Sequence, residues 1–266
     1  MMKKLIYLVM VLVLTACSTV PLTNRKQITA IPSTQMVSLG AQNYTDVLSQ
    51  SKLSSNQSYQ ASVKRVGQRI SQAVEAYLKE IGRSELINGY KWEFNVLQNN
   101  ALNAWCMPGG KIAFYEGIMP VCKDDNGIAV VMSHEIAHAV AKHSNERMTQ
   151  EMAIQFGGMA LSQALSEKKE ETQQIAMLAF GVGSQLGVIL PYSRSHESEA
   201  DELGLYFMAM AGYDPHEAPV FWERMMAQGE SGTPEFLSTH PDPQNRINRL
   251  NHIMPKAVEY YEGKKQ

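Results

Sequence analysis

The stretch His134-Glu135-Ile136-Ala137-His138 decides how this sequence is interpreted. It lies inside an apolar segment, residues 125–143, which predicts a helix that begins after the acidic residue Asp124. Residues four apart share one face of a helix, so the two imidazoles can bind one zinc ion. The glutamate then projects toward the side on which an attacking water would lie. The alternative is a pair of core histidines beside a surface glutamate.

A catalytic zinc site needs a third protein ligand and one open position. The best candidates are Glu197 and Asp201, which are four residues apart and share a helical face. One carboxylate can reach the zinc while the other holds a ligand histidine through its remaining N–H. Glu199 faces roughly the opposite side of the helix and is a reserve ligand, with His196 behind it. A solvated acidic helix face is the alternative for this segment.

A further histidine, His143, follows His138 by five residues. On a continuous helix this spacing rotates its side chain by about 140° from His138. His143 is therefore predicted not to bind the metal. We expect it at the end of the helix, where a partly positive imidazole interacts favourably with the helix dipole.

The flanking segments predict a mostly helical α+β domain. Apolar residues at spacings of three and four predict a helix over residues 58–81, and an apolar–polar alternation predicts a strand over 91–97. A second strand is expected over 111–115, after the turn signal Pro108-Gly109-Gly110. Residues 146–190 predict a helical hairpin rather than a membrane span, because their apolar run is short. Further helices are expected over residues 195–211, from the turn at residues 212–215 to about residue 228, and over residues 243–262.

The strand that follows the glycine turn is expected to bind substrate. We expect it to run along the cleft and to bind an extended chain by strand addition, so that backbone hydrogen bonds supply most of the affinity. The glycines would let the substrate backbone approach closely, and a simple hairpin turn is the alternative. The residues assigned to this stretch are Gly109, Gly110, Lys111, Ile112 and Ala113.

Four motifs, in this order along the chain, resemble peptidase family M48, which includes the CAAX-prenyl protease, the heat-shock membrane enzyme HtpX and smaller lipoproteins. The resemblance covers residues 58–251. It rests on Asn103–Gly110, on the two histidines and glutamate of residues 134–138, on Glu197-x-x-Ala-Asp201 and on Ser238–Arg246. It implies a zincin-like (gluzincin) metalloprotease fold with a small β-sheet whose edge strand lines the active-site cleft.

The resemblance also implies roles for individual residues. One zinc ion per chain would be bound by His134, His138 and Glu197, with Glu135 as the catalytic base and Asp201 supporting a ligand. The implied activity is that of an endopeptidase that hydrolyses unfolded or misassembled envelope proteins with a water activated by the glutamate. The alternative is a chaperone-like or binding lipoprotein that keeps a zinc site and turns over little.

The C-terminal motif contains two residues that can return to the cleft, His240 and Arg246. They are candidates to stabilise the oxyanion or, for His240, to occupy the open zinc position in a resting state. The alternative is a structural role in holding the last helix. His240 is also the candidate fourth ligand if the site is a closed structural zinc site.

The first residues predict a secretion signal. Lys3 and Lys4 precede an apolar stretch over residues 5–14, which is shorter than the ~20 residues of a transmembrane helix. The following Leu14-Thr15-Ala16-Cys17 resembles a bacterial lipobox, so Cys17 is expected to carry a lipid after cleavage. The alternative is an ordinary signal with an incidental cysteine. The residue after the cysteine is Ser18, which favours sorting of the lipoprotein to the outer membrane, where it is expected to face the periplasm.

These signals predict three regions. Residues 1–16 are expected to be a lipoprotein signal peptide, residues 17–34 a lipid-anchored tether, and residues 35–266 the metallopeptidase domain. The expected partners are unfolded or misassembled envelope proteins and, through the lipid anchor, a membrane.

Charge and cysteine content narrow the class of protein further. The net charge of −2, from 24 basic and 26 acidic residues, gives no reason to expect nucleic acid as a partner. Apart from Cys17, the chain contains Cys106 and Cys122. These two either form a disulfide or are two small buried apolar residues.

Overall fold

The described part of the protein is mostly helical with two small β-sheets, which confirms the predicted α+β class. The computed structural model describes residues 17–228, 235–236, 240 and 243–263, so the predicted signal peptide lies outside the described residues. The strands are β1 (Cys17–Thr19), β2 (Lys26–Ile28), β3 (Glu93–Leu97), β4 (Ala104–Met107) and β5 (Lys111–Tyr115). The α-helices are α2 (Ser33–Gln50), α3 (Gln57–Glu80), α4 (Met119–Cys122), α5 (Asp125–Val140), α6 (His143–Ala164), α7 (Glu170–Ser184), α8 (Leu190–Met210), α9 (Glu217–Ala227) and α11 (Pro243–Gly263). Short helical turns are η1 (Ser84–Ile87), η2 (Glu116–Ile118) and the π-helical η3 (Gln185–Ile189).

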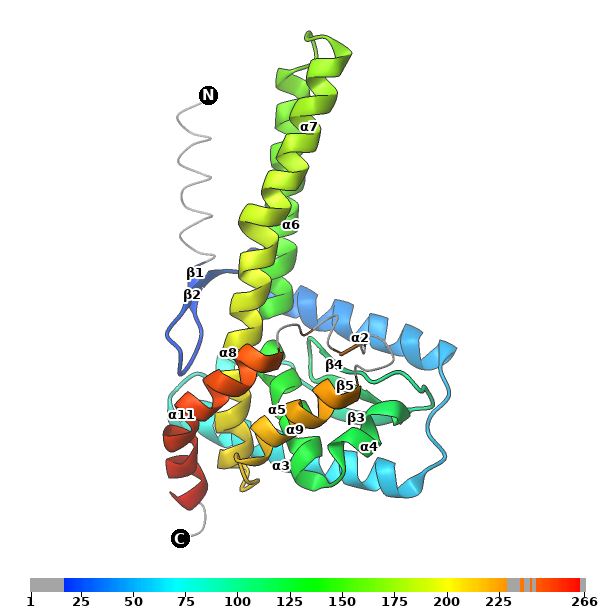
Figure 1. Ribbon diagram of the computed structural model, residues 1–266, viewed down its shortest axis with the longest axis vertical. Helices are drawn as coiled ribbons and strands as arrows, with labels where there is room; N and C mark the ends of the chain where they lie inside the picture. Colours follow the sequence, from blue (N-terminus) through cyan, green and yellow to red (C-terminus); the bar gives the residue numbers. More distant parts are fainter. Residues whose placement is uncertain (1–16, 229–234, 237–239, 241–242, 264–266) are drawn as a thin grey trace.

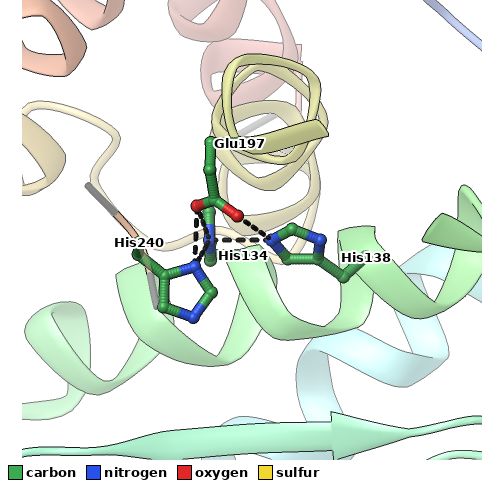
Figure 2. Close-up of side chains that lie close together, drawn as sticks. All are labelled: His134, His138, Glu197 and His240. Carbon is green, nitrogen blue, oxygen red and sulfur yellow. Dashed lines mark hydrogen bonds and ion pairs between the residues drawn. The ribbon is translucent and has the colours of Figure 1, made fainter. Parts of the chain in front are cut away.

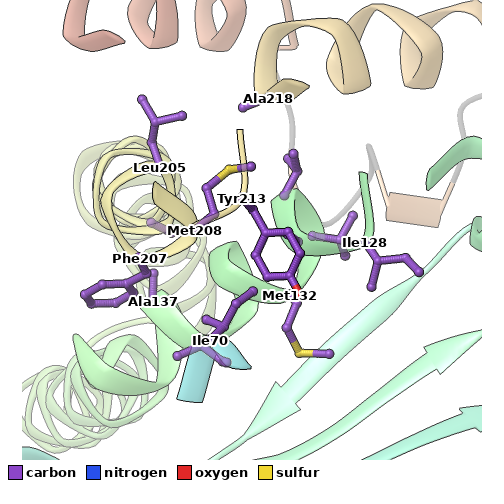
Figure 3. Close-up of a cluster of buried hydrophobic side chains, with 14 of the residues drawn as sticks. Ile70, Ile128, Met132, Ala137, Leu205, Phe207, Met208, Tyr213 and Ala218 are labelled. Carbon is purple, nitrogen blue, oxygen red and sulfur yellow. The ribbon is translucent and has the colours of Figure 1, made fainter. Parts of the chain in front are cut away.

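Helix α5 is the centre of the domain. Its N-terminus is capped by Asp124, whose carboxylate accepts hydrogen bonds from the backbone N–H groups of Asn126 and Gly127. Apolar residues occupy most faces of the helix, so it is buried almost all round and contacts α3, α8, α9 and β4. Figure 3 shows Met132 of α5 in this core with Phe207 of α8. The helix that carries both histidines is thereby held rigidly on several sides.

The three-stranded sheet has the order β3-β5-β4. Strand β5 pairs in parallel with β3 and antiparallel with β4, so Lys111, Ile112 and Ala113 have strand neighbours on both sides. The prediction that this strand forms the edge along the cleft is therefore wrong. Strand β4 was not predicted from the sequence, and it folds back on β5 through Gly109 and Gly110, both at positive φ (92° and 79°). The glycines form a hairpin turn, as in the alternative interpretation, and β4 and β3 are the two edge strands.

A long helical hairpin projects from the domain, as predicted (Figure 1). Helix α6 runs outward, α7 returns, and the charged stretch around residues 165–170 forms the turn at the tip. The return path is continuous from Glu170 to Met210, and by length and composition it is the one described helix that could cross a membrane. Its most apolar part is exposed rather than buried in the domain.

The segment expected to be a tether is folded. Strands β1 and β2 pair antiparallel, with Cys17 opposite Ile28. Val20, in the turn between them, is 1% exposed and belongs to the main apolar core. Burial of this side chain and the ion pairs of Arg25 hold the hairpin against the helical body, so the segment does not behave as an extended tether.

The cysteines of the domain are not paired. Cys106 and Cys122 are both free thiols, Cys106 in β4 and Cys122 at the end of α4. Burial raises the pKa of the Cys122 thiol far above its usual value, which makes it unreactive. Of the two alternatives from the sequence, the structure has the one without a disulfide.

Candidate metal centre and active site

Four side chains from three parts of the chain converge beside α5. His134 and His138 come from α5, Glu197 from α8, and His240 from the segment before α11 (Figure 2). One potential ligand atom from each lies within 4.8 Å of all the others. We call these four residues the donor group. The neighbouring residues 237–239 and 241–242 of the C-terminal motif lie outside the described residues.

The ring atoms of the donor group face a common point. Nε2 of His138 lies 3.1 Å from Nε2 of His134 and 3.3 Å from Oε1 of Glu197. Nδ1 of His240 lies 2.7 Å from Oε2 of Glu197 and 3.2 Å from Nε2 of His134. Three nitrogens and a carboxylate oxygen are a donor set that zinc accepts in tetrahedral geometry.

The ionisation of two donors suits a cation. Burial lowers the pKa of His138 to about 3, so its ring is neutral and a nitrogen lone pair is available. Burial opposes ionisation of Glu197, but the histidines around it hold the pKa of this carboxyl well below its usual value. The pair therefore offers a neutral imidazole and a carboxylate, the protonation states that metal binding requires.

Glu135 lies between the donor group and the edge strand. The backbone N–H of Cys106 in β4 donates to Oε2 of Glu135 at 3.2 Å. The other oxygen, Oε1, is buried without a hydrogen-bond partner among the described residues and lies 3.4 Å from Nε2 of His240. A buried carboxylate oxygen without a hydrogen bond is costly, so a polar ligand that donates to this oxygen would be stabilising. Burial also raises the pKa of Glu135, which suits a general base.

His134 is supported from behind by an ion pair. Its Nδ1 lies 3.2 Å from Oδ1 of Asp201, the position that the sequence analysis expected for one of the two carboxylates. Arg246 donates to both oxygens of Asp201, at 2.5 and 2.7 Å, and its guanidinium lies 3.6 Å from the ring centroid of Trp222. Burial opposes protonation of His134, but hydrogen bonds to Asp201 and Glu197 raise its pKa to about 9. Arg246 therefore holds Asp201 in place, and Asp201 in turn orients the ring of His134.

His143 differs from the expectation of a helix-end residue with a partial positive charge. The helix breaks at Lys142, which has φ of 57°, and His143 starts α6 instead of ending α5. The rotation of about 140° between His138 and His143, expected on a continuous helix, therefore does not occur. Nδ1 of His143 lies 2.8 Å from Nδ1 of His138, and burial lowers its pKa well below the usual value, so the ring is neutral. His143 stands behind a candidate ligand and outside the donor group.

The reserve candidates of the sequence analysis also lie outside the donor group. Glu199 accepts a hydrogen bond from Nε2 of His143 at 2.9 Å and pairs with Arg25. His196 pairs with Glu146 through its Nε2 at 2.8 Å. Spacing on α8 indicated that Glu199 faces away from Glu197, but no signal in the sequence pointed to Glu146 or Arg25.

Comparison with known proteins gives the family. Peptidase family M48 matches residues 60–254. The mitochondrial metalloendopeptidase OMA1 of Schizosaccharomyces pombe is 35% identical over 190 residues, which are 71% of this chain and 53% of that protein. The human metalloendopeptidase OMA1 is 31% identical over 186 residues, 66% of this chain and 35% of that protein. The β-barrel assembly-enhancing protease of Escherichia coli is 27% identical over 177 residues, 63% of this chain and 36% of that protein.

The chain thus spans about half the length, or less, of these relatives. The comparison also corrects the predicted location. A lipid-anchored protein of a bacterial outer membrane, facing the periplasm, was expected from the residues around Cys17, whereas the relatives with 35% identity are named as mitochondrial proteins. The expectation from the four motifs, by contrast, is confirmed: this chain belongs to peptidase family M48.

Proposed function

We propose that this protein is a zinc-dependent metalloendopeptidase. The observation that carries the proposal is the position of Glu135. One of its buried oxygens has no hydrogen bond within the part of the chain that the structure describes, and it lies beside four side chains suited to zinc. A site kept only for structure would need the ligands but no base next to them. The names of the relatives, which are metalloendopeptidases and a protease, support the same activity.

The proposed roles follow the geometry. His134, His138 and Glu197 hold the metal, and Asp201 orients the first of these by accepting from its Nδ1–H. A bound zinc ion would supply Lewis-acid polarisation of the scissile carbonyl and of the attacking water. Glu135 takes the proton of that water and delivers it to the leaving amine. In our proposal, the domain that carries this site has a zincin-type fold, with an edge strand along the cleft.

The proposed substrates are unfolded or misassembled protein segments. Within the described residues β4 pairs only with β5, so its other edge can accept an extended chain by strand addition. Its backbone already touches the catalytic centre through Cys106 and Glu135. A folded segment cannot add to a strand edge, which favours unfolded substrates. The name of the Escherichia coli relative, a β-barrel assembly-enhancing protease, supports proteins that assemble into β-barrels among them.

The fourth donor suggests a resting state. We propose that His240 occupies the fourth position around the metal until substrate arrives. Its Nδ1 lies among the ligand atoms, and the side chain is 11% exposed. A filled fourth position also favours the second candidate function, a chaperone-like or binding protein with a zinc site and low turnover.

One substitution separates the two functions. Glu135→Gln keeps the shape and burial of the side chain but cannot accept a proton, so proteolysis of casein should fall by about 10²–10⁴-fold with zinc content unchanged. The matched control is Glu151→Gln, an exposed carboxylate on α6, which should keep wild-type activity. Casein cleavage within about tenfold of wild type by the Glu135 variant would refute the proposed mechanism. Negligible cleavage by a zinc-loaded wild-type protein would favour the binding function.

A further inference from the structure

An arginine from the N-terminal hairpin reaches the rear of the metal centre. Arg25 directly precedes β2, and its side chain is 20% exposed. Its Nε donates to Oε2 of Glu199 at 2.8 Å, while Nη1 and Nη2 donate to the two oxygens of Glu146 at 3.0 and 2.8 Å. One guanidinium therefore bridges carboxylates from α8 and α6, with Thr23 as a further donor to Glu199.

Each of these carboxylates is buried and holds a histidine. The Glu146 and Glu199 side chains are 3% and 4% exposed. Glu199 lies 2.9 Å from Nε2 of His143, and Glu146 lies 2.8 Å from Nε2 of His196. The two imidazole rings stack, with centroids 4.2 Å apart and an angle of 12° between their planes. Arg25 thus supplies the cation of a buried cluster of two carboxylates and two histidines.

The cluster continues to a candidate ligand through one hydrogen bond. Nδ1 of His143 lies 2.8 Å from Nδ1 of His138. Nε2 of His138 faces the donor group and must be unprotonated to bind a metal, so its Nδ1 carries the hydrogen and donates to His143. His143 then carries its own hydrogen on Nε2 and donates it to Glu199. The hydrogen bonds therefore run from His138 through His143 to Glu199, which also accepts from Arg25.

We infer that Arg25 is a positioning residue for the metal centre, acting through Glu199 and His143 on the ring of His138. Without the guanidinium, two buried carboxylates lose their shared cation, and Glu199 is no longer held as the acceptor for His143. The ring of His138 then loses the contact that fixes its tautomer and orientation. By this inference, the N-terminal hairpin helps to position a metal ligand of the active site. The inference rests on the proposed role of His138 as a ligand.

The test uses metal binding as well as activity. Wild type, Arg25→Leu and Arg25→Lys are titrated with Co²⁺, and the dissociation constant and visible absorption spectrum are measured, together with kcat and KM for a casein-derived peptide. Loss of a group that contacts a metal ligand directly typically weakens metal binding by 10–100-fold. Arg25 acts through two intermediate residues, so we expect the lower end, about tenfold, for Arg25→Leu, with an altered cobalt spectrum and a lower kcat at similar KM. Arg25→Lys keeps the charge and should recover part of the affinity.

The control is an arginine whose ion pair is exposed and lies at the start of α5, outside the donor group. Arg65 donates to both oxygens of Asp125, at 2.7 and 2.8 Å, so Arg65→Leu should bind Co²⁺ as wild type does. Wild-type metal affinity and spectrum in Arg25→Leu would overturn the inference, as would an equal loss in Arg65→Leu. If Arg25→Leu does not fold, Glu199→Leu decides, because this variant removes the acceptor of His143, and unchanged Co²⁺ binding in it would also overturn the inference. A wild-type protein that binds no Co²⁺ at the donor group would instead defeat the proposed function.

Discussion

Gly204 lies where α8 crosses α5, and Gly204→Ala should disturb the metal centre without changing any of its side chains. A methyl group at this position would lie 3.0 Å from the backbone nitrogen of His134 and 3.1 Å from its Cα, about 0.4 Å short of ordinary van der Waals contact. These are backbone atoms of a buried helix and cannot rotate away. The two helices must move apart, which shifts Glu197, two helical turns before Gly204, relative to the histidines.

The expected magnitude follows from two opposing terms. Alanine in place of glycine inside a helix gains about 1 kcal/mol, whereas overpacking a core contact costs about 1–3 kcal/mol. Because the contacts here are to backbone, we expect the upper end of that cost and a net loss of about 2 kcal/mol. For a domain of this size that lowers Tm by roughly 4–8 °C. Displacement of Glu197 should also weaken zinc binding by roughly tenfold.

The assay is calorimetry of the metal-free protein, followed by zinc titration against a competing chelator. The matched control is Gly181→Ala in α7, where an added methyl group meets no atom within 4 Å. This control should raise Tm slightly or leave it unchanged, and should bind zinc as wild type does. A Gly204→Ala protein that melts and binds zinc like the control would refute the argument that close helix contact sets the ligand geometry.

Three further outcomes are expected. Arg246→Met removes the partner of buried Asp201, and breaking a buried ion pair costs about 3–5 kcal/mol, so calorimetry should show Tm lower by roughly 6–20 °C. His240→Ala should raise basal casein cleavage at constant zinc content, whereas a 10²–10³-fold fall in kcat would assign it to the oxyanion instead. The pKa of His134 is raised to about 9 in the metal-free protein, so zinc must displace a proton. Chelator competition should therefore show zinc affinity rising about tenfold per pH unit from pH 7 and levelling above pH 9, and a pH-independent affinity would contradict this.

Local sequence patterns predicted the elements that carry the chemistry. The helix over residues 125–143 and the strand over 111–115 are present at nearly the expected positions, as α5 and β5. The helix has a capping aspartate, Asp124, before a continuous apolar run, and the strand follows a glycine turn. Both signals depend on neighbouring residues, which is why they can be recognised without knowledge of the rest of the fold.

The sheet order and the surroundings of the histidines could not be predicted in this way. Strand β5 is central because it pairs with both β3 and β4, and pairing depends on partners rather than on the pattern of one strand. The contact of His143 with His138 depends on a helix break at Lys142. This residue is neither glycine nor proline, so the sequence carries no usual signal for a helix end there. Arg25 lies more than 100 residues before the two carboxylates that it bridges.

The sequence by itself determined the pair of histidines, the glutamate between them and the membership of family M48, because a spacing of four on a helix is a local property. The tertiary structure decided which carboxylate joins them. Glu197 and Glu199 belong to the same helix, and only the packing of α8 on α5 turns Glu197 toward the histidines and leaves Glu199 behind them. That orientation results from the contact at Gly204 and the ion pairs around it, between residues far apart in the chain, where local spacing carries no information.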